Sequence, residues 1–536
     1  MRAAFLGEPQ LFRDEAASWS LARHSLGGLL SLSSHETFPP LYALLLKGWM
    51  ALFGGSELAL RSLSVVAGVG TVLVTWRWAR TAVGPAGALA AAALVALSPA
   101  LVLNSRDARM YSLETLFATG AWWLLWLLVA EGAAWSGRRR HAAELGLVLL
   151  VAGEVWTMSL GIPIAALQLL FAITALMWLR TRAAANGVGC VVAGGLSLAP
   201  WLPNLLSVAF SGQPFWTPRP DVFSLAATFA AWFPGDLRGA SPLAVVLGVL
   251  LLAVIGALVF GAYVALGQAT ASHPGAGPTT GAAGPTALPP GSSLQRGRLL
   301  ALALALGVGL VPVVWAYSQL HSIYETRYLG AAFPPLAIAS GAALLVAAGR
   351  LRRNFRTAQR LPQGALAILL VVPIASVMAV GTAYSVDQSV RGIGIEPARQ
   401  MAQELGGLAH PGDAIITLNA QTYFPLDYYL RQTGVAERLG IELFDWHRPS
   451  AAYFTGWMDI DGANIVDDAK VAGAGWSGAL HLAPGGVLWC VTLVDPDREF
   501  ANFTPLAAGR LRQLKRIPVS GGGLTGEIRE AVPIGA

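Results

Sequence analysis

Two adjacent carboxylates, Asp14 and Glu15, stand in the stretch "LFRDEAASW" near the start of a chain in which charge is scarce. Only 12% of the 536 residues are Asp, Glu, Lys or Arg, whereas 55% are hydrophobic. A carboxylate can take the proton of a reacting hydroxyl group, so this pair is a candidate general base. By composition alone, a solvated loop is the simpler interpretation.

Four further polar stretches carry residues that could join such chemistry. Arginine holds phosphate through paired hydrogen bonds and stays charged, and aromatic faces pack against sugar rings. This combination suits the transfer of a sugar from a lipid-linked phosphate to a hydroxyl group. The candidates are Glu36 in "SSHETFPPLY", Arg106, Asp107, Arg109 and Tyr111 in "NSRDARMYS", Trp216 in "QPFWTPRPDVF", and Arg327 and Tyr328 in "YETRYLG".

Each candidate also has a plainer interpretation. Asp107 could form an exposed ion pair with its neighbouring arginines, worth roughly 0–1 kcal/mol. Arg327 could anchor the end of a membrane span, and Trp216 fits an aromatic interface belt better than a sugar platform. Glu154, within a span, is a functional candidate by default, although it could simply hydrogen-bond a neighbouring helix.

The elements that would position these residues are apolar runs long enough to cross a bilayer as helices. The sequence predicts a polytopic membrane protein, mostly helical, with about ten spans. They are expected at 60–80, 86–103, 112–131, 144–160, 161–179, 187–207, 241–267, 298–318, 330–349 and 362–384.

The arginines predict the orientation of these spans. They gather in short loops near residues 77–80, 138–140, 180–182, 296–298 and 350–360. If all five loops are cytoplasmic, as the positive-inside rule requires, one topology satisfies every one of them. Arginines in such loops also explain the net charge of +6 without nucleic acid as a partner.

All four polar stretches and the Asp14–Glu15 pair then face outward, provided that residues 41–55 do not span. Lys47 lies in the middle of that short segment, which therefore favours an interfacial helix.

The predicted domains are 1–58, a first extracytoplasmic loop with interfacial helices; 59–385, the transmembrane domain with an outer loop at 208–240 and a disordered cytoplasmic loop at 268–297; and 386–536, a small extracytoplasmic α/β domain.

The two cysteines, Cys190 and Cys490, suggest neither a disulfide framework nor a metal site. No other residues have convincing metal-ligand spacing. We therefore expect no cofactor, although a divalent metal ion is not excluded.

The ordered series "LFRDEAASW", "PPLYALLLKGWMALFGGSELALRSLSVVAG", "LVLNSRDARMYSLETL" and "YETRYL" resembles the GT-C glycosyltransferases. The nearest group looks like the bacterial dolichyl-phosphate-mannose–protein mannosyltransferase-like proteins of the glycosyltransferase family 39 type, relatives of the aminoarabinose–lipid A transferases. The likeness is firm over about residues 5–130. Family members carry a span before the "DE" loop, so we expect this chain to be short at its N-terminus.

The resemblance implies a multi-pass protein of the cytoplasmic membrane with an extracytoplasmic active site. Its partners would be the bilayer, a polyprenyl-phosphate sugar donor and an acceptor that is a protein, lipid or glycan, with inverting transfer. Asp14 would be the base, supported by Glu15, and Asp107 would be the acid of the second outer loop. Arg109 and Arg327, with Arg106 beside them, would face the donor phosphate, while Glu36, Tyr111, Trp216 and Tyr328 would contact substrate.

Two other functions stay open at this point. A lipid or solute transporter would need charged residues along its mid-membrane positions and an internal repeat. A non-catalytic membrane scaffold on the same fold would act through its outer domain and would tolerate the loss of Asp14.

Overall fold

The computed structural model describes the chain except for residues 211–216, 236–292, 393–394, 447–463, 522 and 535–536. It divides into two compact units that both draw on distant parts of the sequence. The helical unit comprises Met1–Ala4, Arg61–Pro203 and Phe215–Val386. The α/β unit comprises Phe5–Leu60, Asn204–Pro214 and Asp387–Ala536.

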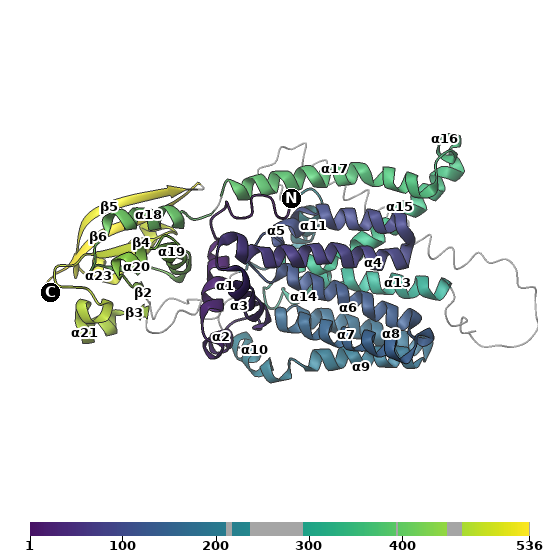
Figure 1. Ribbon diagram of the computed structural model, residues 1–536, viewed down its shortest axis with the longest axis horizontal. Coiled ribbons are helices and arrows are strands. Elements are labelled where there is room, and N and C mark those ends of the chain that lie inside the picture. The colour runs from purple at the N-terminus through teal and green to yellow at the C-terminus, as the bar shows by residue number, and fades with distance from the viewer. Residues whose placement is uncertain (211–216, 236–292, 393–394, 447–463, 522, 535–536) are drawn as a thin grey trace, which may run out of the picture. The chain divides into compact units, whose positions relative to one another are not determined.

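In the helical unit, long apolar helices run side by side (Figure 1). Its elements, with the flanking parts of helices that continue into the other unit, are α4 (Glu57–Leu97), α5 (Pro99–Asn104), α6 (Tyr111–Glu131), η1 (Gly132–Ala134), α7 (Gly137–Thr157), α8 (Gly161–Leu179), α9 (Arg182–Leu196), η2 (Ala199–Trp201), α10 (Leu202–Ala209), α11 (Val222–Trp232), α13 (Ser293–Val308), α14 (Leu310–Tyr317), η3 (Thr326–Ala332), α15 (Phe333–Asn354), α16 (Arg356–Gln359) and α17 (Gln363–Val390).

Seven helices among the described residues are long and apolar enough to cross a membrane, which confirms the polytopic fold class. The predicted span 60–80 lies in α4, and the predicted span 86–103 is divided between the end of α4 and α5. Helix α4 breaks at Gly84, where φ is 83°. The span predicted at 144–160 coincides with most of α7, a helix of 21 residues. The span at 241–267 lies outside the described residues.

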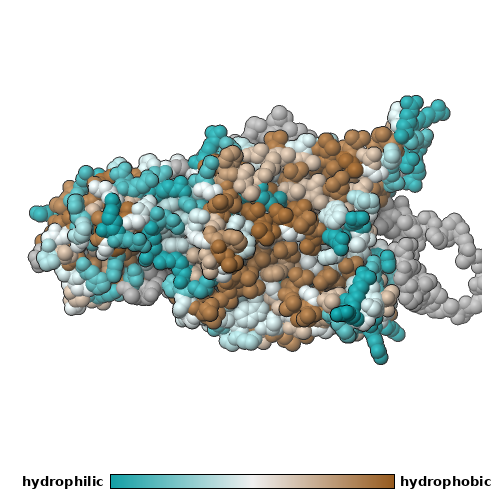
Figure 2. Space-filling view, viewed as in Figure 1, coloured by the Kyte–Doolittle hydropathy of each residue, from teal (hydrophilic) through white to brown (hydrophobic). Residues whose placement is uncertain are grey.

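Hydrophobic residues cover much of the visible face of this unit, and hydrophilic residues gather at helix ends (Figure 2). The arginine-bearing ends of α15 and α13, the short helix α16 and the α8–α9 turn lie at the same end of the unit (Figure 1). This grouping is what one cytoplasmic basic face would require. Within the predicted loop 268–297, residues 268–292 are not described, and residues 293–297 already belong to α13, so this end of the prediction was wrong.

The turn between α7 and α8 is so tight that the first residue of α8, Gly161, must be glycine. A Cβ atom added to Gly161 would lie 2.4 Å from the carbonyl oxygen of Glu154. We expect Gly161→Ala to destabilise the protein by about 1–3 kcal/mol, because backbone must move to admit the methyl group. Thermal unfolding of the purified chain measures this effect. Gly189→Ala in α9 is the matched control, since its Cβ would meet nothing within 4 Å, and an equal loss in both variants would contradict the explanation.

The α/β unit combines the first helices of the chain with a C-terminal mixed sheet. Its helices are α1 (Arg13–Arg23), α2 (Leu26–Ser33), α3 (Leu41–Phe53), α18 (Ala398–Leu408), α19 (Ala420–Gln432), α20 (Val435–Leu439), α21 (Asp468–Leu480), α22 (Pro496–Ala501) and α23 (Thr504–Ala507). Its strands are β1 (Ala414–Thr417), β2 (Leu443–Trp446), β3 (Ile465–Val466), β4 (Leu488–Thr492), β5 (Leu511–Gly521) and β6 (Leu524–Pro533).

The strand order is β3-β2-β1-β4-β6-β5, with β1 to β4 parallel and the β5–β6 hairpin antiparallel (Figure 1). The small C-terminal sheet domain, with a helix at α18 and strands at β1 and β4, is therefore confirmed. Helix α3 has 13 residues, or about 20 Å at 1.5 Å per residue, which is short of a bilayer core of about 30 Å.

Candidate active site

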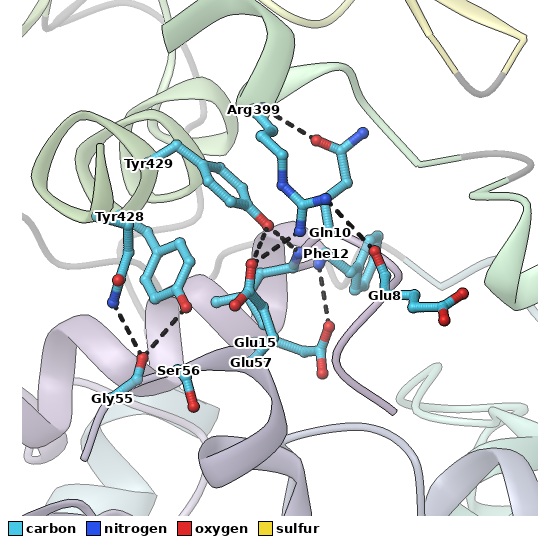
Figure 3. Close-up of polar contacts among 12 residues, drawn as sticks. Glu8, Gln10, Phe12, Glu15, Gly55, Ser56, Glu57, Arg399, Tyr428 and Tyr429 are labelled. Carbon is cyan, nitrogen blue, oxygen red and sulfur yellow. Dashed lines mark hydrogen bonds and ion pairs between the residues drawn. The ribbon is translucent and has the colours of Figure 1, made fainter. Parts of the chain in front are cut away.

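The predicted base lies in the first turn of α1, within the α/β unit. Asp14 and Glu15 are 3% and 2% exposed, so neither is a solvated loop residue. The Glu15 carboxylate accepts a hydrogen bond of 3.0 Å from the amide of Phe12, which caps the helix from inside (Figure 3). Glu15 thereby fixes the turn that presents Asp14.

A second carboxyl group accompanies Asp14, and the sequence analysis missed it. The Arg13 guanidinium lies 3.9 Å from Asp14 and 3.8 Å from Glu396, and it donates to Gln421 at 2.9 Å. Burial raises the pKa of Glu396; Arg13 opposes that shift, and the nearby charge of Asp14 adds to it. The unit thus assembles two acids around one arginine from segments about 380 residues apart in sequence.

The chain enters α1 through a buried polar network (Figure 3). The Leu11 amide donates to the Tyr429 hydroxyl group at 2.7 Å, and that hydroxyl donates to Glu57 at 3.3 Å. Arg399 pairs with Glu57 at 2.8 Å, and its own amide donates to Gln10 at 2.9 Å. Burial raises the pKa of Tyr429, so the phenol stays protonated and can donate. These contacts tie the segment before Asp14 to helices α18 and α19.

Tyr429→Phe is expected to destabilise the α/β unit by about 1–3 kcal/mol, because the buried Leu11 amide loses its acceptor. Thermal unfolding should show the loss, and hydrogen exchange should rise in the peptide that contains Leu11. Tyr384→Phe is the matched control, because it removes the same hydroxyl group from a residue that is 50% exposed. Unchanged exchange at Leu11 in Tyr429→Phe would refute the anchoring role.

Glu36 also belongs to the α/β unit, just after α2. It is half-buried, and its amide donates to the carbonyl of Ser33 at 3.1 Å. Trp216, the aromatic residue predicted to contact substrate, lies outside the described residues.

Arginines and tyrosines from two segments meet in the helical unit. The rings of Tyr111 and Tyr328 lie 5.5 Å apart. The Arg327 guanidinium lies 5.7 Å from the Tyr111 ring centre and 5.5 Å from that of Tyr328, and Arg109 lies 5.9 Å from Tyr111. We name these four residues the arginine–tyrosine cluster. It unites residues that the sequence predicted for donor and substrate binding.

Hydrogen bonds to the backbone hold the cluster in place. Asn104 donates to the carbonyl of Arg327 at 2.9 Å, and Ser64 donates to the carbonyl of Arg109 at 3.1 Å. The hydroxyl groups of Tyr324 and Thr228 are 2.7 Å apart, which fastens the segment before η3 to α11. Two guanidinium groups placed over aromatic faces can bind an anion that carries an apolar or sugar group.

Arg106, also predicted to bind the donor phosphate, lies elsewhere in the same loop. It is 3% exposed, and its guanidinium donates to the carbonyls of Met1, Arg2 and Ala4 at 2.6–3.3 Å. These contacts suit positioning of the loop. Asp107 is half-buried, and its carbonyl accepts from the amide of Arg109 at 2.7 Å.

The described residues contain no group of three or more His, Cys, Asp or Glu side chains that could hold a metal ion. Asp14, Glu15 and Glu36 belong to the α/β unit, whereas Asp107 and the arginine–tyrosine cluster belong to the helical unit.

Comparisons with known proteins concern one segment of the sequence and the fold of the chain. Residues 37–204 match the family model described as dolichyl-phosphate-mannose-protein mannosyltransferase. No curated protein matches the chain by sequence. The crystal structure of ArnT from Cupriavidus metallidurans in the apo state is similar, with a TM-score of 0.60 and 15% identity over 98% of this chain and 95% of that one.

The structure of the same ArnT bound to undecaprenyl phosphate is also similar, with a TM-score of 0.58, 14% identity and the same two coverages. A likeness at this identity concerns the fold, and it extends over nearly the full length of both chains. The chain therefore has an ArnT-like fold over nearly its whole length, and residues 37–204 of its sequence match the mannosyltransferase family model.

Proposed function

We propose that the protein transfers a sugar from a polyprenyl-phosphate donor to an acceptor at the outer face of the cytoplasmic membrane. The observation that carries this proposal is the fold shared, over 98% of the chain, with an ArnT that has been crystallised with undecaprenyl phosphate. The family described for residues 37–204 uses a sugar on a lipid phosphate as well, according to its name.

The arginine–tyrosine cluster would bind the donor phosphate. Arg109 and Arg327 supply two permanent positive charges, and guanidinium groups match phosphate oxygens through paired hydrogen bonds. Tyr111 and Tyr328 hold the guanidinium groups over their rings and offer flat faces to the sugar. The polyprenyl tail would lie along the apolar helices.

Asp14 would act as the general base. It would accept the proton of the acceptor hydroxyl or amine while that oxygen or nitrogen attacks the anomeric carbon of the sugar. The bond from the anomeric carbon to the phosphate oxygen breaks as the new bond forms, which inverts the configuration. Polyprenyl phosphate leaves with the negative charge. Glu15 supports this step by capping the turn that carries Asp14.

The proposed side of the membrane rests on the arginines. The positive-inside rule places the basic end formed by α13, α15, α16 and the α8–α9 turn in the cytoplasm. The loop before α6 and the segment η3, which carry the cluster, would then face outward.

The function is tested with membranes that contain the chain and matched membranes that lack it. Radiolabelled polyprenyl-phosphate sugars are supplied one at a time, and label is followed into protein, lipid and polymer fractions. We expect chain-dependent label in one fraction, which identifies the acceptor. Absence of transfer from every donor, with the protein folded and inserted, would favour a scaffold on the same fold.

A further inference from the structure

Two acidic side chains that the proposed reaction does not use lie deep among the membrane helices. Glu114 in α6 is 1% exposed, and Glu154 in α7 is completely buried. Both helices are apolar along most of their length. Burying an ionisable group inside such a bundle costs free energy, so its presence calls for a functional explanation.

The packing of α6 against α7 brings the two acids to the same level. Cβ atoms added to Gly153, Gly120 and Gly146 would lie 3.0–3.1 Å from the side chains of Phe117, Leu150 and Leu124, respectively. These pairs show antiparallel helices in which position 114 faces position 156. Glu154 is two residues away, a displacement of about 3 Å along the helix axis.

Acceptor atoms dominate this site. The Gln168 amide, from α8, donates to one oxygen of Glu154 at 3.0 Å. The other oxygen of Glu154, both oxygens of Glu114 and the carbonyl oxygen of Gln168 have no hydrogen-bond partner among the described residues. Four buried acceptors without donors call for added protons, a cation or further hydrogen-bond donors.

The basic residues on the elements packed against α6 and α7 do not supply a partner for these acceptors. No described Lys, Arg or His forms an ion pair with Glu114 or Glu154. On the elements that contact α6 and α7, the basic residues lie at helix ends or in loops: Arg327 on η3, Arg138–His141 on α7, Arg182 on α9 and Arg296 and Arg298 on α13, with Glu131 and Glu144 as further acids. Two ions left buried would each cost several kcal/mol.

We propose that Glu114, Glu154 and Gln168 form a proton-binding site in which both carboxyl groups are neutral in the folded protein. Two protons, one on each carboxylate, satisfy the site better than a metal ion, because a proton needs no coordination shell and turns the carboxylate that binds it into a hydrogen-bond donor. The described residues also offer no third carboxylate, cysteine or histidine for a metal ion there.

The site has a consequence for donor binding that rests on the proposed function. Tyr111 lies three residues before Glu114 and therefore on the same face of α6. A neutral Glu114 leaves the positive charge of the arginine–tyrosine cluster undiminished. An ionised Glu114 would compete with the lipid phosphate for Arg109 and Arg327.

Infrared spectroscopy of the full chain tests the site independently of activity. In a detergent without ester groups at neutral pH, we expect a protonated-carboxyl C=O band that shifts in D₂O and is lost in Glu114→Gln/Glu154→Gln. Glu131→Gln is the matched control, because Glu131 also lies on α6 but pairs with Arg296 at 3.6 Å; it should lower only the carboxylate band.

Three results would overturn the proposal. The wild type could lack the protonated band, the band could survive in the double variant, or it could appear only after Na⁺ and divalent ions are removed, which would indicate a cation site. The consequence for binding has its own readout, since Glu114→Gln should bind undecaprenyl phosphate as tightly as the wild type. A tenfold loss there would refute that consequence while leaving the infrared result standing.

Discussion

Asp14→Asn is expected to lower sugar transfer by about 10²- to 10⁴-fold, the usual contribution of a general base. The amide keeps the size of the carboxylate but cannot take the acceptor proton. Because donor binding is assigned to other residues, the loss should appear in kcat, with KM for the donor changed little. Initial rates with whichever polyprenyl-phosphate sugar supports transfer in the labelling assay measure both constants.

Glu8→Gln is the matched control for this experiment. Glu8 lies six residues earlier in the same segment and is exposed, so its neutralisation should leave the rate unchanged. Thermal unfolding must show that Asp14→Asn is folded, since Asp14 is itself buried. Wild-type transfer by a folded Asp14→Asn variant would remove this residue from catalysis, although the proposed transfer reaction would stand.

Arg327→Ala should weaken donor binding by about 10- to 100-fold. Charged hydrogen bonds to a buried partner contribute about 1.5–3 kcal/mol, and a factor of ten corresponds to 1.4 kcal/mol. The variant also uncovers the facing rings of Tyr111 and Tyr328. Binding of undecaprenyl phosphate to the purified chain measures the effect directly, and Arg327→Lys should recover only part of the affinity, because an ammonium group cannot bind in the same forked manner.

Arg353→Ala provides the comparison at the basic end. Arg353 is exposed near the end of α15, a helix of 22 residues that starts directly after η3. It therefore lies about 30 Å from the arginine–tyrosine cluster at 1.5 Å per residue. If both alanine variants lose affinity equally, general charge attraction explains the binding and the cluster does not.

The sequence predicted the helical bundle well, because apolar runs of about 20 residues have few alternatives in a membrane protein. It also identified α18, β1 and β4, whose helical spacing or apolar runs are local signals. It missed the β5–β6 hairpin. Most of β5 is exposed and carries Arg512, Lys515 and Arg516. The strand therefore lacks the alternation of apolar and polar residues by which a half-buried strand is recognised in a sequence.

The candidate site was predictable in part. Topology alone grouped Arg109 and Tyr111 with Arg327 and Tyr328, since their loops share one side of the predicted bundle. The contacts of Arg106 with the first four residues, and of Arg13 with Glu396, left no sequence signal because the partners are far apart in the chain. Glu114 did carry a signal, an acid one turn inside an apolar span, but it was overlooked beside Glu154.

The hydrogen bond between Leu11 and Tyr429 joins residues 418 positions apart, and this separation governs the order of folding. At about 5–20 residues per second, the ribosome needs roughly 20–80 s after making Leu11 to reach its partner. The spans can insert into the bilayer one after another during that time. The first helices reach their final packing only after α19 has been synthesised, so the α/β unit is completed after the membrane helices from α4 to α17 have left the ribosome.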